Sequence, residues 1–388
     1  MEHITEAMIQ LISSEICGSP LCLPSDICLS EKFLVELLLL ARKHGIAQIV
    51  SAALINNGYL ENSPQKGLFM NEIYSSVYSY EKMNTVFNEV CSAFEKDRIP
   101  YIPLKGAVIR NLYPQPWMRS SCDIDILVKE KDLDFAIASL GRLGGYKQKD
   151  KSNHDVTFVS ADGIAVEIHY KLLGDKKSPL YTKVLSSVWN SAELQTGYKY
   201  RYLLSDGIFY YYHILHMAKH LRKGGCGIRS FIDLWLMNEK YNFDTAAIKR
   251  VLKQGKLLKF ENSVRELSCV WFSDAQYTDK TYQLQDFVVK GGIFGTTGTR
   301  IISDTQRKGG KIGYILSRVF VPFRYLKKEY PILKKYPFLA PWCEICRLFS
   351  LLFGKKKIFK DNYIEKINNE AEKQKSNNTL LFKDIGLK

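Results

Sequence analysis

Apolar side chains recur every three or four residues over the first part of the chain, which is the spacing of one face of a helix. The pattern extends from about residue 4 to residue 97. It is clearest over residues 31–45 and 67–96, where long apolar runs alternate with charged positions. We therefore expect an N-terminal helical layer.

The period changes to two after residue 97, which favours strands. Strands are predicted over residues 101–104, 123–128, 155–160 and 164–169. Ala161-Asp-Gly163 is a hairpin signal between the last two. Helices are predicted over residues 107–112, 131–143, 206–223, 229–241 and 245–271, and a glycine-rich loop over 291–298.

This order of elements predicts an α+β fold, in which a small mixed sheet with flanking helices lies between helical regions. We expect an N-terminal helical region, a strand-containing core, a helical domain, a basic aromatic region and a polar tail with a composition typical of disorder. These parts are predicted to cover residues 1–97, 98–203, 204–290, 291–361 and 362–388.

The composition is that of a globular protein with more than one domain. The chain has 388 residues, of which 46% are hydrophobic and 12% aromatic. We see no secretory signal and no run of about 18 apolar residues, so we expect a cytoplasmic protein. The nine cysteines have no regular spacing, and this favours reduced thiols. Cys343 and Cys346 form a CxxC without a second pair, which predicts core cysteines on a helix.

Most of the net charge of +15 belongs to one segment near the C-terminus. Residues 307–360 contain fourteen Lys and Arg and two acids, a net charge of +12. An electrostatic partner is therefore expected to bind there. Within this segment, residues 342–353 are apolar and are followed by three lysines. Peripheral contact with an anionic membrane is one interpretation, but a helix packed on the catalytic core is favoured.

Two aspartates stand two residues apart on one predicted strand. Successive side chains of a strand point to opposite faces, so Asp123 and Asp125 project from the same face. Glu167 lies in a later alternating strand and adds a third carboxylate if the two strands are neighbours. Three carboxylates on two strands suit Mg²⁺ (or Mn²⁺), which leaves other coordination positions to water and phosphates. The pattern predicts phosphoryl or nucleotidyl transfer.

The motifs around this strand resemble those of a known family. They are Leu104-Lys-Gly-Ala107, Leu112-Tyr-Pro114, Arg119, Asp123-Ile-Asp-Ile-Leu-Val128 and Val166-Glu-Ile-His169. Their order is similar to that of uncharacterised bacterial nucleotidyltransferases in the DNA polymerase beta-like superfamily. The resemblance covers about residues 30–350 and is specific over about 100–170. It implies a polymerase beta-like nucleotidyltransferase core. One departure is that Lys105-Gly106 stands where the superfamily usually has Gly-Gly or Gly-Ser.

The resemblance implies a role for each motif. Asp123, Asp125 and Glu167 would be the catalytic residues and the metal ligands, with Glu167 either facing the nucleophile through a metal or accepting its proton. Gly106 would let phosphates approach the backbone and a helix N-terminus. The other expected nucleotide-binding residues are Lys105, Arg119, His169 and Arg229. Alternatives are an exposed turn position for Lys105 and a structural hydrogen bond for His169.

His213, His216 and His220 fall on one face of a predicted helix. Zinc is not favoured, because no cysteine or carboxylate stands at a matching position. Arg229 and Asp233 have the i, i+4 spacing of an ion pair within a helix. The alternative is that this helical domain closes over the nucleotide, with His216, His220 or Arg229 contacting phosphate or acceptor.

The leading hypothesis is a Mg²⁺-dependent nucleotidyltransferase. It would move a nucleoside monophosphate from an NTP such as ATP to an unidentified small molecule, peptide or protein, and release pyrophosphate. We expect an acidic or phosphorylated acceptor that binds the basic segment. Nucleic acid is not favoured as a partner, because no nucleic-acid-binding module is recognisable. Two alternatives are a non-catalytic NTP-binding or interaction protein and a nucleic-acid-binding protein that uses the basic segment.

Overall fold

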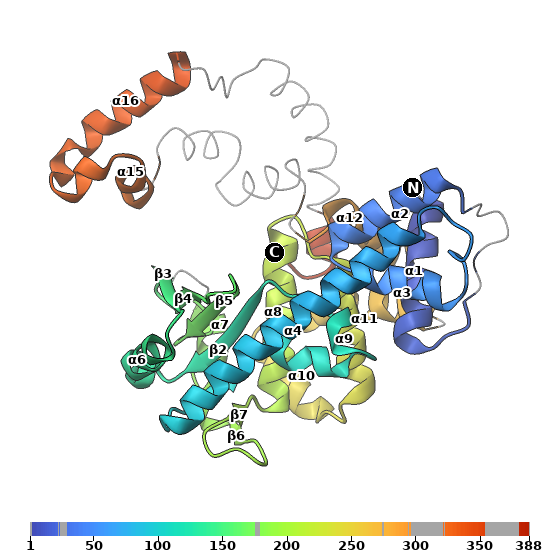
Figure 1. Cartoon of the computed structure of the whole chain (residues 1–388), viewed down its shortest axis with the longest axis horizontal. Helices are drawn as coiled ribbons and strands as arrows, with labels where there is room; N and C mark the ends of the chain where they lie inside the picture. Colours follow the sequence, from blue (N-terminus) through green and yellow to red (C-terminus); the bar gives the residue numbers. More distant parts are fainter. Residues whose placement is uncertain are drawn as a thin grey trace.

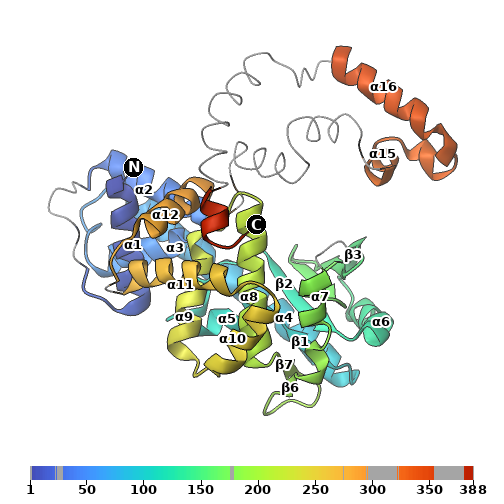
Figure 2. The same cartoon turned by 180° about the vertical axis from the view of Figure 1, so that it is seen from behind.

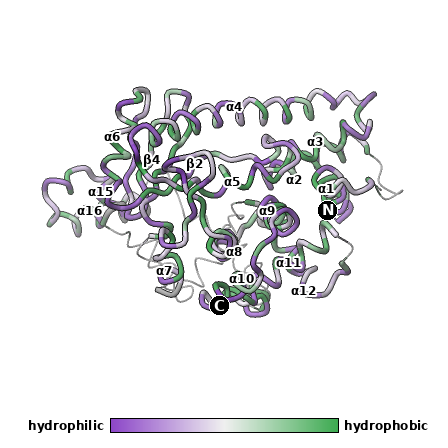
Figure 3. The backbone as a smooth tube through the Cα atoms, turned by 90° about the horizontal axis from the view of Figure 1, so that it is seen from below, coloured by the Kyte–Doolittle hydropathy of each residue, from purple (hydrophilic) through white to green (hydrophobic). Residues whose placement is uncertain are grey.

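One long helix, α4 (Lys66–Lys96), joins a group of helices to a five-stranded sheet (Figure 1). The computed structural model describes residues 2–21, 23, 29–174, 179–273, 275–293, 295, 321, 323–353 and 380–387. Figure 3 shows α4 extending along one side of the molecule. It contacts α3 (Ala47–Asn56) among the helices and α6 (Leu133–Leu143) beside the sheet.

The predicted N-terminal helical layer is present. It contains α1 (Glu2–Cys17), α2 (Glu31–His44), α3 and α4. Helix α2 begins after Ser30, whose hydroxyl accepts a hydrogen bond from the Phe33 N–H, and ends at Gly45 in the left-handed region (φ 67°). These are the capping residues that such ends favour. The end of α2 is thereby fixed beside the helices that follow the sheet.

The sheet has the strand order β1-β2-β5-β4-β3. The strands are β1 (Tyr101–Pro103), β2 (Asp123–Val128), β3 (Lys147–Lys151), β4 (Asp155–Val159) and β5 (Ala165–His169). Strands β2 and β5 are parallel, and the other pairs are antiparallel. All four predicted strands are confirmed, including the hairpin, where the Gly163 N–H donates to the Ser160 carbonyl over 3.0 Å.

One face of the sheet is covered by α4 and α6. Ile124 and Ile126 point to this face and are buried with Phe94 of α4 and Leu140 of α6. The alternation of β2 therefore turns Asp125 to the opposite face, towards the helices that follow the sheet. Because Ile124 and Ile126 anchor the strand, a register slip would bury charge under α4 and is strongly disfavoured.

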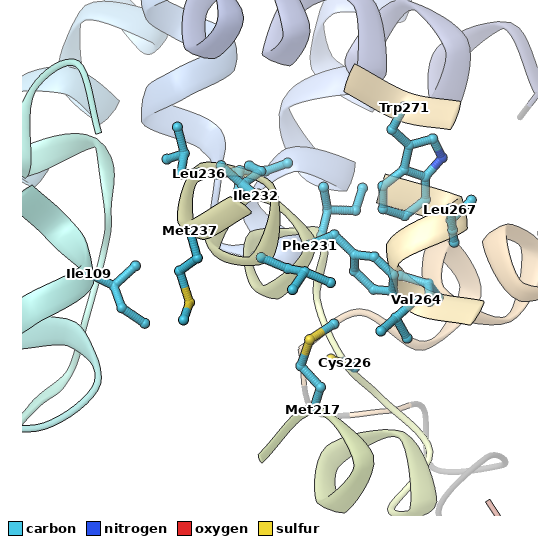
Figure 4. Close-up of a cluster of buried hydrophobic side chains, with 14 of the residues drawn as sticks. Ile109, Met217, Cys226, Phe231, Ile232, Leu236, Met237, Val264, Leu267 and Trp271 are labelled. Atoms are coloured by element: carbon cyan, nitrogen blue, oxygen red, sulfur yellow. The ribbon is translucent and has the colours of Figure 1, made fainter. Parts of the chain in front are cut away.

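A group of five consecutive helices, α8 to α12, packs together after the sheet in the described chain. They are α8 (Asp206–Arg222), α9 (Ile228–Lys240), α10 (Thr245–Gln254), α11 (Leu258–Phe272) and α12 (Asp279–Gly291). Helix α9 lies at their centre, with Phe231 between Met217 of α8 and Val264 of α11 (Figure 4). The predicted helices over 206–223 and 229–241 are confirmed.

The helical pattern predicted over residues 245–271 is present but is divided into two helices, α10 and α11. The chain breaks between α10 and α11, where Lys256 has a φ of 52°. A Cβ atom at Gly255 would lie 2.3 Å from the Tyr211 ring, so the packing of α8 requires glycine at this point. Strand β3 was not predicted, and neither were the short elements α7 (Pro179–Leu185), β6 (Glu193–Leu194) and β7 (Tyr202–Leu203).

Helices α15 (Phe323–Glu329) and α16 (Ala340–Phe353) form a small core of their own with Leu326, Leu333 and Cys343 (Figures 1 and 2). The CxxC lies on α16 as predicted, and Cys343 is buried, but Cys346 is exposed and is therefore not the core cysteine that was predicted. Part of the basic segment and half of the predicted loop at 291–298 lie outside the described residues. None of the helices that the structure describes is both long and apolar enough to span a bilayer.

Candidate active site

The two strands that carry the acidic residues are neighbours, as the sequence hypothesis required. Strands β2 and β5 pair in parallel, and their register sets Asp125 opposite Glu167. Directly opposed residues of adjacent strands project from the same face of a sheet. Their side chains therefore meet on the face that α4 and α6 leave uncovered.

Asp125, Glu167 and His169 form one compact group. Each offers an oxygen or nitrogen ligand atom, and these atoms lie within 4.8 Å of one another. His169 Nε2 lies 2.8 Å from Asp125 Oδ1 and 3.4 Å from Glu167 Oε2. Lys105 Nζ donates to the same Asp125 oxygen over 2.9 Å. Asp125 is thus held between two basic side chains.

This contact pattern stabilises charge in a buried place. Asp125 is only 4% exposed, and burial alone would raise the pKa of its carboxyl, but Lys105 and His169 outweigh burial and hold the pKa well below its usual range. Burial alone would likewise lower the pKa of His169. Hydrogen bonds to Asp125 and then Glu167 outweigh it and raise the pKa to about 9. The Asp125 carboxylate therefore stays ionised.

Asp123 lies at the start of β2, beside this group rather than in it. Its carboxylate accepts a hydrogen bond of 3.2 Å from the Ser121 hydroxyl. Burial, followed by the charge of Asp125, raises the pKa of Asp123. A buried carboxylate and a partly buried one that repel each other are an arrangement that a divalent cation stabilises. The role of Asp123 as a ligand stays a prediction.

Lys105 is not an exposed turn residue. It directly precedes α5 (Gly106–Ile109), and its side chain is 24% exposed with the ammonium bonded to Asp125. Its backbone has a φ of 43° and a ψ of −113°, which residues with a side chain rarely adopt. The 3-10 turn Arg110–Leu112 continues α5, so the predicted element at 107–112 is present with only four α-helical residues. So short a helix adds little macrodipole at Gly106.

Arg119 binds Asp233 on α9. Its Nε and Nη2 atoms donate to the two carboxylate oxygens over 2.8 Å each, and the Tyr113 hydroxyl adds a bond of 2.7 Å. The predicted ion pair between Arg229 and Asp233 is therefore wrong, because a better-aligned bidentate partner arrives from outside the helix. Arg229 Nη1 instead donates to the Ser120 carbonyl over 2.6 Å, which holds the segment before β2.

Gly106 makes room for this arginine. A Cβ atom at Gly106 would lie 2.7 Å from Arg119 Nη1 and 3.1 Å from the Ser121 hydroxyl. The glycine is thus required by protein packing, whether or not a phosphate approaches it. With Nε and Nη2 bound to Asp233, the Nη1 side of the guanidinium faces the turn that begins at Gly106.

Two cavities flank the acidic residues. One, of about 230 Å³, lies between β5 and α8 and is lined by Glu167, His169 and Lys105. The other, of about 210 Å³, lies between α4 and the 3-10 turns that follow α5, and it is lined by Arg110, Arg119, Ser121 and serines of α4. We call them the β5–α8 cavity and the α4–α5 cavity. Asp125 contacts the lining of the first and Asp123 the lining of the second.

The sequence matches one model of a known protein family. A family model described as an uncharacterised nucleotidyltransferase matches residues 34–273, which is more than half of the chain. The protein belongs to this nucleotidyltransferase family. The matched region includes β2, β5 and all the lining residues of both cavities. No curated protein matches the chain significantly.

Membership of this nucleotidyltransferase family supports a transferase role at the level of the family. The small mixed sheet with its flanking helices is consistent with the expected core.

Two residues that line the α4–α5 cavity, Arg110 and Ser121, were not predicted from the sequence. Arg110 is 8% exposed and its Nε donates to the Gly106 carbonyl over 2.8 Å. Burial and the nearby Arg119 lower its pKa to about 10. Ser121 bonds Asp123. Only their spacing in the sequence could have indicated them. Arg110 stands one helical turn after Gly106, and Ser121 stands two residues before Asp123.

Among the described residues, no group of three possible metal ligands includes a histidine of α8. His213 Nε2 lies 3.1 Å from the Ser230 carbonyl, and the Nε2 atoms of His216 and His220 lie 3.2 Å apart. Burial lowers the pKa of His220 to about 4 and that of His216 well below its usual range. Both rings are therefore neutral near pH 7.

Proposed function

We propose that the protein is a Mg²⁺-dependent nucleotidyltransferase that transfers a nucleoside monophosphate from an NTP to an acceptor and releases pyrophosphate. The observation that carries this proposal is the parallel register that sets Asp125 opposite Glu167, with Asp123 on the same face. The family membership supports the reaction class. ATP is one candidate NTP, and Mn²⁺ is the alternative metal.

The residues fit a hard divalent cation. Asp123, Asp125 and Glu167 offer carboxylate oxygens from adjacent strands, which are the ligands that Mg²⁺ and Mn²⁺ prefer. The raised pKa of Asp123 marks uncompensated negative charge that such an ion would offset. When bound, Mg²⁺ would polarise the reacting phosphate and neutralise charge on pyrophosphate. Lys105 and His169 would keep Asp125 ionised and oriented.

We propose that the triphosphate occupies the α4–α5 cavity. Two buried guanidinium groups, Arg110 and Arg119, line it together with hydroxyl groups of α4 and Ser121. Arginine and hydroxyl donors suit phosphate oxygens. Asp123 links this cavity to the rest of the acidic group through Ser121. Side-chain donors, rather than the helix N-terminus at Gly106, would therefore bind the phosphates.

The acceptor would react from the side of Glu167. An acceptor oxygen would bond to the α-phosphorus of the NTP, while the bond from that phosphorus to the bridging oxygen breaks and pyrophosphate leaves. The proton of the acceptor would pass to Glu167, either directly or through water. Glu167 lines the β5–α8 cavity and its side chain is 28% exposed, so it can be reached.

Glu167→Gln is the test of this proposal. Asp125 is a poorer target, because its loss would leave the buried Lys105 and His169 without their carboxylate. We expect Glu167→Gln to lower transfer by about 10³-fold while the protein stays folded, since a carboxamide neither accepts the proton nor offsets metal charge. The measurement is transfer of label from α-labelled NTPs to a cell extract with Mg²⁺, read as added mass, and Mn²⁺ binding by calorimetry.

Glu36→Gln, at an exposed position of α2, is the matched control and should behave as the wild type. Wild-type transfer in Glu167→Gln would sink the catalytic assignment. If the wild-type protein bound NTP and Mn²⁺ but transferred nothing to any extract, the non-catalytic NTP-binding alternative would replace it.

A further inference from the structure

We propose that one face of α16, together with the turn before it, is a docking surface for an anionic lipid membrane. This inference does not depend on the proposed nucleotidyl transfer. From the sequence, residues 342–353 were expected to pack on the catalytic core. In the structure the buried Cys343 of this helix belongs instead to the small core that α16 shares with α15.

Helix α16 is oriented with apolar side chains on its outer side. Trp342 and Ile345 stand three residues apart, on one face of the helix, and are 65% and 45% exposed. Phe338, just before α16, is 75% exposed. The opposite side of the helix carries Cys343 and Arg347, which are buried. We call Phe338, Trp342 and Ile345 the apolar face of α16.

Polar contacts behind the helix fix this orientation. Arg347 donates to both carboxylate oxygens of Glu344, over 2.9 Å from Nε and 2.8 Å from Nη2. The Val321 N–H donates to the same carboxylate over 3.0 Å. Rotating α16 to bury Trp342 would carry Glu344 away from Val321, and losing a hydrogen bond to a largely buried carboxylate is costly. The apolar face is therefore held outwards.

An apolar face of this composition suits the interface of a membrane. Amphipathic helices lie along a bilayer with Trp, Phe and Leu side chains inserted below the headgroups. Tyr336, which is 40% exposed, packs edge-on against Phe338 with ring centroids 6.0 Å apart. Tyrosine and tryptophan are the residues enriched at the level of the headgroups. The exposed apolar surface thus continues into the turn before α16 with residues of the same preference.

Basic residues lie on both sides of the apolar face. Lys334 and Lys335 are exposed in the turn before Phe338, and three lysines at positions 355–357 follow α16 in the sequence. Lysines beside an inserted apolar face attract anionic lipid headgroups. A neutral groove on a protein would accept the apolar side chains but would gain nothing from these lysines.

The net charge favours a membrane over a second copy of the chain. The basic segment at residues 307–360 holds +12 of the total of +15. Ion pairs inside the segment leave its net charge unchanged, and the rest of the chain, at +3, has no negative excess to offset it. Two copies joined through this face would bring two such segments together, and like charges repel. An anionic bilayer attracts the segment and accepts its apolar side chains.

The test is sedimentation of the full chain with vesicles of phosphatidylcholine alone or of equal parts of phosphatidylcholine and phosphatidylglycerol. We expect binding to the anionic vesicles to be at least about tenfold tighter and to weaken with salt. Trp342 gives a second readout, because it is the most exposed of the five tryptophans. Its emission should shift to shorter wavelengths when the protein binds the anionic vesicles.

Trp342→Ala tests the apolar face. We expect at least about tenfold weaker binding to the anionic vesicles, since the inserted ring supplies much of the buried apolar area. Trp342→Phe should keep most of the binding but lose the emission shift. Phe135→Ala is the matched control, because it removes a ring of α6 that is 68% exposed, and it should bind as the wild type does.

Lys334→Gln/Lys335→Gln tests the charge. We expect at least about fivefold weaker binding to the anionic vesicles and a smaller dependence on salt. Lys147→Gln/Lys149→Gln removes the same charge from the exposed strand β3 and should leave binding unchanged. Circular dichroism checks that all variants are folded.

Three results would overturn the proposal. The first is no binding of the wild type to either vesicle, which would assign the face to a protein partner. The second is binding that is equal for both vesicle compositions or unaffected by Trp342→Ala. The third is a dimer of the wild type in light scattering, without lipid, that Trp342→Ala dissociates, because the face would then hold a second copy.

Discussion

At the scale of single residues, Lys105 is where side-chain chemistry and backbone preference conflict. Its φ of 43° favours glycine, and the wider superfamily that the sequence resembles usually has glycine in this turn. Strained backbone conformations persist when the surrounding structure holds them. Here the hydrogen bond of 2.9 Å to Asp125 supplies that restraint. We infer that the ammonium is retained in spite of a local conformational cost.

Comparing Lys105→Gly with Lys105→Ala tests this account. Both variants lose the ammonium, but only glycine adopts the positive φ without strain. We expect the glycine variant to be more stable than the alanine variant by about 1 kcal/mol, and both to lose most transfer activity. Urea unfolding measures the difference in stability. A more stable alanine variant would show that the turn relaxes and that strain is not the reason for the local geometry.

At the scale of elements, His44 joins three helices. It is the last residue of α2, and its Nδ1 accepts a hydrogen bond of 3.2 Å from the N–H of Ile228, the first residue of α9. Its Nε2 lies 3.2 Å from the Val289 carbonyl of α12, to which it donates. Because Nδ1 must accept while Nε2 donates, this junction requires a neutral ring.

The junction predicts a loss of stability in acid. Burial lowers the pKa of His44 to about 4, whereas the unfolded chain has the ordinary value of about 6.5. The unfolded state therefore binds the proton first, so the contribution of His44 is complete above pH 6.5 and is lost as the pH falls towards 4. By pH 5 the loss is about 2 kcal/mol.

His44→Gln can keep both hydrogen bonds but cannot titrate. We expect its free energy of unfolding to fall less than that of the wild type between pH 7 and pH 5, as measured in urea at both pH values. His3→Gln, at an exposed position of α1, serves as the control and should keep the wild-type pH dependence. Identical pH dependence of His44→Gln and the wild type would show that the junction does not titrate in this range.

The elements also show what the sequence could predict. Strands β4 and β5 alternate buried and partly buried positions, and β2 alternates aspartate and isoleucine over residues 123–126, so the period of two identifies all three. Strand β3 is Lys-Gln-Lys-Asp-Lys and exposed throughout. It forms through backbone pairing at the sheet edge, where lysines are favoured, and leaves no hydrophobic pattern.

The candidate site could likewise be predicted only as far as local alternation along a strand reaches. The common face of Asp123 and Asp125 follows from local alternation, and Glu167 from a second alternating strand. The partner of Arg119 is 114 residues away in the chain, and no local pattern indicates it. Arg229 was the nearer choice for Asp233, which is why sequence spacing gave the wrong pair. Cavity walls made by α8 likewise depend on tertiary packing.

At the scale of the whole molecule, the net charge was an incomplete guide to the site. Part of the basic segment lies outside the described residues, and its role in acceptor binding stays a prediction. Three cationic side chains that line the β5–α8 cavity, Lys219, Arg222 and Lys223, belong instead to α8, outside that segment. The sum of charges along the chain therefore does not locate the charged side chains that line a site.

The end of the chain returns to the helical core. Residues 380–387 were part of the predicted polar tail, yet Leu381, Ile385 and Leu387 are buried there. Phe382 packs edge-on against Phe287 of α12, with ring centroids 5.4 Å apart. The predicted disorder does not extend to these residues, because four large apolar side chains in eight positions gain more from burial than ordering them costs.

Ile385→Ala measures what this return contributes to the main body. Ile385 is fully buried, so its truncation removes apolar contacts and leaves a cavity, and we expect a loss of about 2–4 kcal/mol in the free energy of unfolding. Leu380→Ala is the matched control: this neighbour is 56% exposed and should change stability by less than about 0.5 kcal/mol. Urea unfolding followed by tryptophan fluorescence gives both values, since Trp271 lies in the same core as Ile385. Equal, small losses in the two variants would mean that the segment 380–387 does not stabilise the fold in solution.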